Sequence, residues 1–241
     1  MQPIIEIRLA MVSCGYTPIP VIGKIPPLER WPEVANVSRS ILEDWDRDWP
    51  NASNTGILTR HTPTIDLDLL NEPAAIAAEE IVRKRFESLG CVLTRIGRAP
   101  KRAIPFRTKA PFKKLTTNFV VPAGAGAEKI EFLGDGQQFV AHGIHPDTQR
   151  PYTWIGGDPT TVAYKDLPEI ASAEEARQLQ VDIVAMLVRD FGYITIVAAL
   201  AIASHSASSA ASAQTESRFG FLRAALSRVV DFFFGAPCVV T

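Results

Sequence analysis

The chain has 241 residues, of which 46% are hydrophobic and 21% are charged, and its formal net charge at pH 7 is −1. These values indicate one large globular domain, or a domain with an appendage, and they exclude a chain that is polycationic as a whole. Any surface that binds nucleic acid must therefore be a local patch. The three cysteines are far apart and form no CxxC pair. They argue against a zinc site or a disulfide framework, and they predict a protein of the reducing cytoplasm.

The first part of the sequence predicts two helices followed by two strands. Glycine ends the first helix, and Ser38 or Ser40 caps the second, which stops before a proline. The expected ranges are 4–14 and 38–50 for the helices, and 54–59 and 64–70 for the strands. Because the sequence HTP between these strands is typical of a turn, we expect residues 56–70 to form a hairpin.

The second part predicts a strand-rich region between two longer helices. The helices cover 72–90, with a proline near the start and a glycine at the end, and 172–192, where Ser172 and Glu175 fit a capping box. Strands are expected over 91–97, 102–108, 115–122, 129–134 and 137–143. The sequence GDG between the last two strands predicts a second hairpin.

The composition changes near residue 193. Residues 191–204 are apolar, but this run of 14 residues is shorter than the roughly 20 that a bilayer-spanning helix needs, so we expect no membrane segment. An Ala/Ser-rich stretch follows. We interpret 171–195 as the last helix of the domain, and 196–241 as a low-complexity linker with an atypical tail to which we assign no function.

Two aspartates, Asp66 and Asp68, interrupt the apolar strand PTIDLDLL. Successive side chains of a strand point to opposite faces, so both carboxylates would share one face. Two like charges that close repel each other, and burial adds a desolvation cost. Mg²⁺ or Mn²⁺ would remove that repulsion, and two such ions can serve a phosphoryl displacement. The alternative is that the pair forms the exposed polar face of an amphipathic strand.

Glu131 is a third acid among apolar neighbours, in the strand KIEFLG. It is a candidate third metal ligand and catalytic carboxylate beside Asp66 and Asp68. The alternative is a strand residue that simply faces solvent.

A basic stretch lies between these acids. Residues 95–114 hold eight basic side chains and no acid, which is a strong local asymmetry in a chain of net charge −1. Phosphates attract such patches, and the interleaved Phe106 and Phe112 offer faces for stacking. The alternative is a solvated basic surface, or contacts that balance acids elsewhere, such as Asp44, Asp46 and Asp48. The basic residues are Arg95, Arg98, Lys101, Arg102, Arg107, Lys109, Lys113 and Lys114.

The loop GIHPDTQRPYTW, residues 143–154, follows the predicted Glu131 hairpin. Its His145 and Tyr152 are candidates for sugar, base or phosphate recognition, and packing of the turn is the alternative. We expect Trp154 to be a packing residue, because tryptophan mostly buries area.

Taken in order, these motifs resemble the N-terminal domain of bifunctional DNA primase/polymerases, in the archaeo-eukaryotic primase superfamily. The resemblance covers residues 1–170 and rests on GYTPIPVIGKIPP, NTGILT, TIDLDLL, IGRAPKRAIPFR and IEFLGDGQQFVAHGIHPDTQRPYTW. It implies an α+β primase-like fold, in which an RRM-like catalytic sheet packs against a second small α/β unit. It also implies a replication enzyme of a phage, prophage or plasmid.

The resemblance implies template-directed nucleotidyl transfer with two Mg²⁺ or Mn²⁺ ions held by Asp66, Asp68 and Glu131. The partners would be a DNA template and NTPs or dNTPs. Because the sequence shows no GxxxxGK[ST] loop, any helicase would be a separate chain, or else the gene is truncated. The nucleotide phosphates would be bound by Arg98, Lys101, Arg102, Arg107 and His145, and DNA by Lys109, Lys113 and Lys114.

One departure from the family pattern bears on activity. Most members carry a histidine in the central motif, but the block GRAPKRAIPFR has none. A catalytically inactive DNA- or nucleotide-binding remnant is therefore the main alternative. A two-metal nuclease is a further alternative.

Overall fold

The computed structural model describes residues 3–121 and 126–202, and the predicted linker and tail lie outside the described residues from residue 203 onward. Within these ranges the chain forms two antiparallel sheets and several helices, so the predicted α+β class is confirmed. The small sheet has the strand order β1 (Pro18–Val21), β2 (Asn54–Leu58), β8 (Gln138–His142). The large sheet has the order β6 (Leu115–Asn118), β7 (Lys129–Leu133), β3 (Thr64–Asp68), β5 (Arg102–Pro105), β4 (Thr94–Ile96), β9 (Thr153–Ile155).

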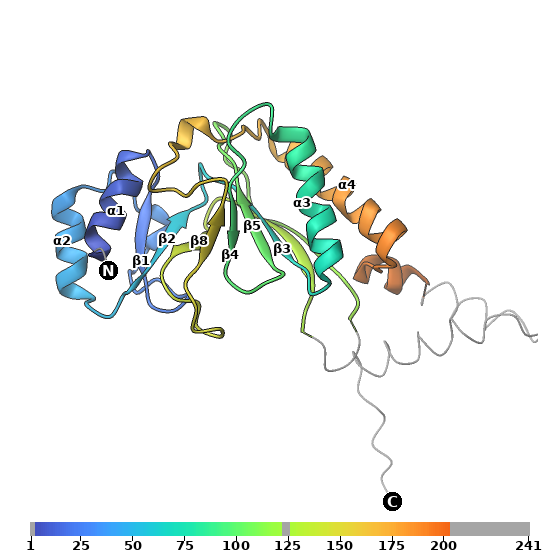
Figure 1. Ribbon diagram of the computed structural model, residues 1–241, viewed down its shortest axis with the longest axis horizontal. Helices are drawn as coiled ribbons and strands as arrows, with labels where there is room; N and C mark the ends of the chain where they lie inside the picture. Colours follow the sequence, from blue (N-terminus) through green and yellow to red (C-terminus); the bar gives the residue numbers. More distant parts are fainter. Residues whose placement is uncertain (1–2, 122–125, 203–241) are drawn as a thin grey trace, which may run out of the picture.

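The helices lie on the outer sides of the two sheets (Figure 1). Helices α1 (Ile4–Ser13) and α2 (Arg39–Asp48) flank the small sheet, and α3 (Glu72–Phe86) and α4 (Ala173–Phe191) flank the large one. Two short 3-10 helices, Trp31–Glu33 and Tyr164–Asp166, lie in the connections. Among the described residues, no helix meets the length and hydropathy that a membrane span requires.

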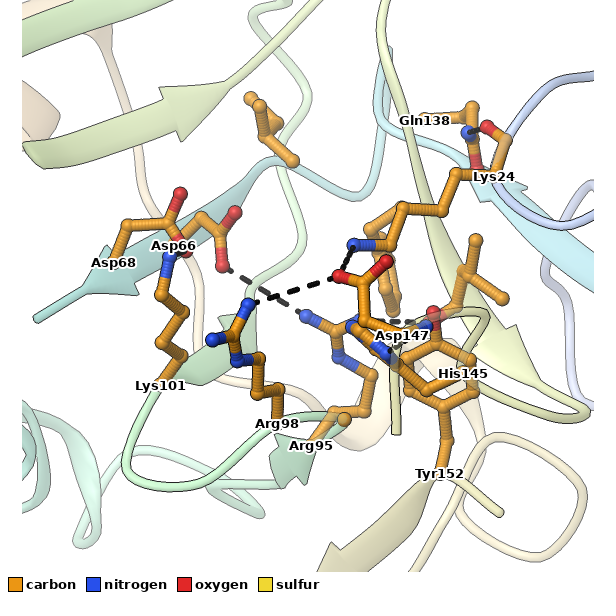
Figure 2. A pocket seen from close by; sticks show the side chains of 14 residues that line it. Lys24, Asp66, Asp68, Arg95, Arg98, Lys101, Gln138, His145, Asp147 and Tyr152 are labelled. Atoms are coloured by element: carbon orange, nitrogen blue, oxygen red, sulfur yellow. Dashed lines mark hydrogen bonds and ion pairs between the residues drawn. The ribbon is translucent and has the colours of Figure 1, made fainter. Parts of the chain in front are cut away.

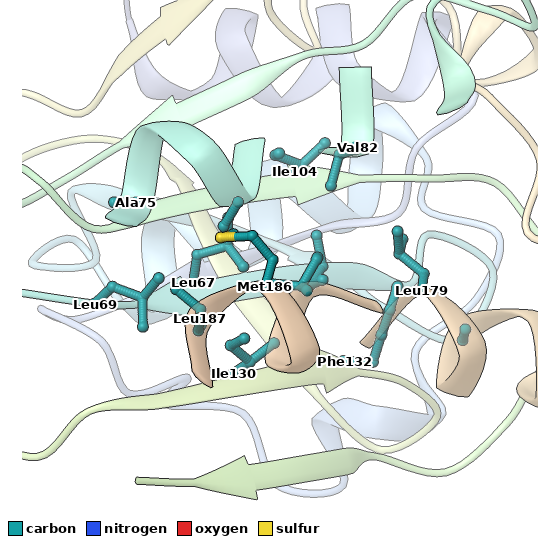
Figure 3. Close-up of a cluster of buried hydrophobic side chains, with 14 of the residues drawn as sticks. Leu67, Leu69, Ala75, Val82, Ile104, Ile130, Phe132, Leu179, Met186 and Leu187 are labelled. Atoms are coloured by element: carbon teal, nitrogen blue, oxygen red, sulfur yellow. The ribbon is translucent and has the colours of Figure 1, made fainter. Parts of the chain in front are cut away.

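The largest core lies between the large sheet and helices α3 and α4 (Figure 3). Ile65, Leu67 and Leu69 of the central strand region have no exposed surface, and they pack with alanines of α3 and with Leu187 of α4. Burial of these side chains stabilises the sheet–helix contact by roughly 1.5–3 kcal/mol each. Because side chains alternate along a strand, this packing turns Asp66 and Asp68 to the opposite face.

Both predicted hairpins are wrong. Strand β2 pairs with β1 and β8, and β3 pairs with β5 and β7; likewise β7 and β8 belong to different sheets. The two predicted turns exist, but each carries the chain from one sheet to the other. They lie side by side, since the Thr59 N–H donates to the Gln137 carbonyl (3.0 Å) and the Thr59 hydroxyl to the Gly134 carbonyl (2.6 Å).

Helix starts follow the predicted capping residues. Ser38 caps α2, accepting from the Ile41 N–H at 3.3 Å, and Ser172 caps α4, accepting from the Glu175 N–H at 3.2 Å. The Glu175 carboxylate accepts from the N–H of Ala171, one residue before the serine that a capping box would use.

Candidate active site

The three predicted carboxylates lie on neighbouring strands of the large sheet. Asp66 stands opposite Glu131 of β7 on one side and Ala103 of β5 on the other, and Asp68 stands opposite Lys129. Directly opposed residues project to the same face, so Asp66, Asp68 and Glu131 share the face away from α3 and α4. Asp66 and Asp68 line a cleft, whereas Glu131 is buried beside it with 4% of its surface exposed.

The cleft has a volume of about 220 Å³ and lies between the two sheets. Gln138, Phe139 and Val140 of β8 form one wall, and the aspartates of β3 belong to the other. Figure 2 shows cationic side chains that enter this space from both sides. The basic lining residues are Lys24, Arg95, Arg98, Lys101 and His145.

Arg95 is the most firmly held cation of the cleft. One guanidinium nitrogen donates to the Val140 carbonyl (3.1 Å), another lies 3.7 Å from Asp66 Oδ1, and the group is 5.1 Å from the centre of the Tyr152 ring. Its side chain is only 13% exposed. Because arginine is always charged and carries several donors in a rigid plane, Arg95 places a fixed positive charge next to Asp66.

The other cations of the cleft are less constrained. Lys101 Nζ lies 3.3 Å from Asp68 Oδ1. Lys24 Nζ and Arg98 Nη1 each lie 3.8 Å from the same oxygen, Asp147 Oδ2 (Figure 2). The side chains of Lys24, Arg98 and Asp147 are each more than half exposed. Exposed ion pairs are worth about 0–1 kcal/mol, so an incoming anion can displace Asp147 from both cations.

His145 is held as a neutral donor at the cleft. Its Nδ1 accepts from the backbone N–H groups of Asp147 (3.2 Å) and Thr148 (3.4 Å), so the proton belongs on Nε2. Burial lowers the pKa of His145, and the charge of Lys24 lowers it further. The ring therefore stays neutral at pH 7, with one N–H to offer a ligand.

The charges around Asp66 and Glu131 are balanced differently. Burial raises the pKa of Asp66 to about 6 against the attraction of Arg95, and Asp68 and Glu131 add to the rise by repulsion. Burial also acts to raise the pKa of Glu131, but hydrogen bonds from Lys114 (2.6 Å) and Lys129 (2.7 Å) outweigh it and lower that pKa. The single guanidinium of Arg95 thus does not offset the cost of burying the Asp66 charge, whereas Glu131 is neutralised by two lysines.

The donor set fits a divalent cation in part. Asp66 and Asp68 offer hard oxygen ligands, and the raised pKa of Asp66 marks excess negative charge that a cation would offset. Among the described residues, however, no group of three or more His, Cys, Asp or Glu side chains is placed to hold a metal. Glu131 would become a ligand only after Lys114 or Lys129 moved away.

Two predicted phosphate ligands lie away from the cleft. Arg102 follows Lys101 by one residue and therefore projects to the helix side, where its Nε lies 2.6 Å from the Glu79 carboxylate of α3. Arg107 donates to the Leu167 carbonyl (2.9 Å) and pairs with Glu169. Neither guanidinium reaches the aspartates, because both are used in holding the sheet to its surroundings.

The three predicted DNA-binding lysines also lie outside the cleft lining. Lys113 is 81% exposed at its side chain and pairs with Asp135 at 2.8 Å, while Lys109 is exposed. Lys114 pairs with Glu131, so it is the one closest to the acidic face.

Sequence reasoning missed several residues of the site. Lys24 and Asp147 were not singled out, and Arg95 was counted only as part of the basic stretch. For Arg95 the available signal was the alternation of side chains along the strand TRI, which puts Arg95 and Thr94 on opposite faces. In the structure Thr94 is fully buried on the helix side, so Arg95 faces the cleft. Nothing in the local sequence around Lys24 indicates that its side chain lies close to Asp147.

Paired aspartates in a cleft rimmed by cations are an arrangement typical of proteins that bind phosphorylated ligands. The model of the bifunctional DNA primase/polymerase N-terminal domain matches residues 8–170, more than half of the chain. The chain therefore belongs to the Prim-Pol family, and the predicted resemblance is confirmed. Comparison with curated proteins gives no match.

Proposed function

We propose that this protein is a DNA primase/polymerase that transfers nucleotides onto a growing strand under the direction of a DNA template. Family membership implies a nucleotidyltransferase of the primase/polymerase type. The observation that carries the finer proposal is that Asp66 and Asp68 face a cleft in which four cations and a neutral histidine converge. From the resemblance we further propose that the protein replicates the DNA of a phage, prophage or plasmid, and that it does so in the cytoplasm.

The cations of the cleft would bind the triphosphate of an incoming NTP or dNTP. Arg95 offers a firmly held guanidinium beside Asp66, and Arg98 and Lys101 offer two further positive charges. His145 would donate its Nε2–H to a phosphate oxygen without adding charge. Together these donors orient the α-phosphate for in-line attack by the 3′-hydroxyl of the primer, with pyrophosphate as the leaving group.

Asp66 and Asp68 would hold Mg²⁺ or Mn²⁺, and Glu131 would join them once a lysine withdraws. Two such ions would activate the 3′-hydroxyl of the primer and stabilise the charge on the leaving pyrophosphate. The aspartates would hold the ions in a fixed position, because both lie on a strand whose other face is packed against two helices. Rigid strands position ligands better than loops do.

The template and primer would lie next to the cleft along the basic residues Lys109, Lys113 and Lys114. Lysines on an exposed surface contact phosphates without reading bases, which suits a polymerase that accepts any sequence. A separate helicase chain is the further partner in this proposal.

A catalytically inactive nucleotide-binding protein is the second candidate. It is favoured by the two lysines that neutralise Glu131 and by the absence of a histidine from the block GRAPKRAIPFR. A primer-extension assay with Mg²⁺ or Mn²⁺ separates the two. We expect the wild-type protein to extend a primed template and Asp68→Asn not to; binding of DNA and nucleotide without any extension would favour the second candidate, and loss of labelled strand would indicate a nuclease.

A further inference from the structure

Lys24 reaches the cleft from the small sheet, opposite the other cations. It lies in a two-residue turn that is closed by reciprocal backbone bonds between Ile22 and Ile25 (2.9 and 3.0 Å). Arg95, Arg98 and Lys101 come instead from one short stretch beside the large sheet. Lys24 is therefore the one of the four cationic lining residues that reaches a ligand from the side of the small sheet.

The turn that carries Lys24 is fastened by a buried asparagine. Asn54, which is 2% exposed, donates from Nδ2 to the carbonyls of Gly23 (2.8 Å) and Ile144 (2.9 Å), and its Oδ1 accepts from the Ile144 N–H (2.8 Å). One side chain thus joins the Lys24 turn to the loop that holds His145. The neighbouring Gly143, with φ of 118°, leaves room for this amide, since a Cβ there would lie 2.0 Å from Asn54 Oδ1.

Asp147 marks the point at which the two sides meet. Its Oδ2 lies 3.8 Å from both Lys24 Nζ and Arg98 Nη1, so one oxygen is shared by cations from opposite walls (Figure 2). A phosphate oxygen is also negatively charged, and it accepts charge-assisted hydrogen bonds from lysine and arginine as a carboxylate does. The position of this carboxylate oxygen is therefore where a phosphate would be held.

We propose that Lys24 binds the triphosphate of the incoming nucleotide from the side of the small sheet, and that Asn54 is the positioning residue that keeps Lys24 in reach. This inference rests on the proposed function. Lys24 adds a ligand from the first 25 residues to a site otherwise built from residues 66–152. Asn54 contacts no ligand itself and acts through the backbone of the turn.

The test is a double-mutant cycle on the nucleotide KM in primer extension. Lys24→Ala should raise KM about tenfold with kcat unchanged, as expected for the loss of one charge-assisted hydrogen bond that serves binding. Asn54→Ala should raise KM clearly more in the wild-type background than in the Lys24→Ala background, where only its effect through the His145 loop is left. Lys84→Ala, an exposed lysine on α3, is the matched control and should leave KM unchanged.

Two results would overturn the inference. An unchanged KM in Lys24→Ala removes Lys24 from the site, and an equal effect of Asn54→Ala in both backgrounds means that Asn54 does not act through Lys24. Thermal unfolding checks that each variant is folded, and Asn54→Ser, whose hydroxyl can retain one bond, is measured in parallel.

A second measurement separates this inference from the proposed function. Calorimetric titration with inorganic tripolyphosphate, without metal, should show about tenfold weaker binding for Lys24→Ala than for the wild type or Lys84→Ala. If the wild type extends no primer, the proposed function fails while this comparison still decides the role of Lys24. Equal affinities overturn the role of Lys24 whether or not the protein polymerises.

Discussion

Replacing Asp66 by asparagine should stabilise the metal-free protein at neutral and alkaline pH. The folded state raises the pKa of Asp66 from its ordinary value of 3.8 to about 6, chiefly by burial. The carboxyl therefore holds its proton more tightly in the folded than in the unfolded chain. Below about pH 3.8 the group is protonated in both states, and as the pH rises through about 6 the folded state alone carries the cost of a buried charge.

The size of the effect follows from that shift. Each pKa unit corresponds to about 1.36 kcal/mol, so the wild type loses about 3 kcal/mol of unfolding free energy across this pH range, a loss that Asp66→Asn avoids. For a domain of this size, that is a rise in Tm of roughly 6–12 °C at pH 8. At pH 4 the two proteins should differ little, because Asp66 is then largely neutral in the wild type as well.

Urea unfolding in EDTA at pH 4, 6 and 8 measures this prediction. Glu80→Gln removes an exposed carboxylate of α3 and should change the unfolding free energy by less than about 0.5 kcal/mol at every pH. Added Mn²⁺ should stabilise the wild type more than Asp66→Asn, because a ligand that binds only the folded state raises its stability. If Asp66→Asn were no more stable than the wild type at pH 8, the reasoning that burial of the Asp66 charge outweighs the attraction of Arg95 would be refuted.

Three further predictions concern the walls of the cleft. Arg95→Lys keeps the charge but loses the flat group that stacks on Tyr152, so the nucleotide KM in primer extension should rise about tenfold, and an unchanged KM would show that charge alone suffices. Gly97→Ala places a Cβ 2.4 Å from Tyr152 Cε1 and should lower the unfolding free energy in urea by about 1–3 kcal/mol; no loss would mean that the ring can move aside. Asp147→Asn frees Arg98 and Lys24 from a competing carboxylate, so the KM should fall up to about fivefold at low salt and less in high salt. A rise in KM would instead show that Asp147 holds these cations in position.

The sequence predicted most helices and strands but not how the strands are paired. Local patterns report which residues alternate and where turns lie, and these were correct for β3, β7, β8 and α4. They do not report which strand lies alongside, and both turns with hairpin signals connect different sheets. The pairing is decided instead by long-range contacts such as those of Thr59 with residues 134 and 137.

The same limit applies to the site. Asp66 and Asp68 could be placed on one face because they share a strand, and the register adds Glu131 to that face. A run of basic residues, however, does not act as one surface. Lys101 and Arg102 are neighbours, but one pairs with Asp68 and the other with Glu79 on the helix side.

The cleft lining has nearly balanced charge, and this bears on the form in which a nucleotide would enter. With His145 neutral, four positive side chains face three carboxylates, those of Asp66, Asp68 and Asp147. A bare triphosphate would leave a large excess of negative charge in a partly buried space, whereas a nucleotide that arrives with divalent cations is nearly neutral. By charge balance, a cleft of this composition would thus bind a nucleotide that carries its cations more tightly than the bare triphosphate.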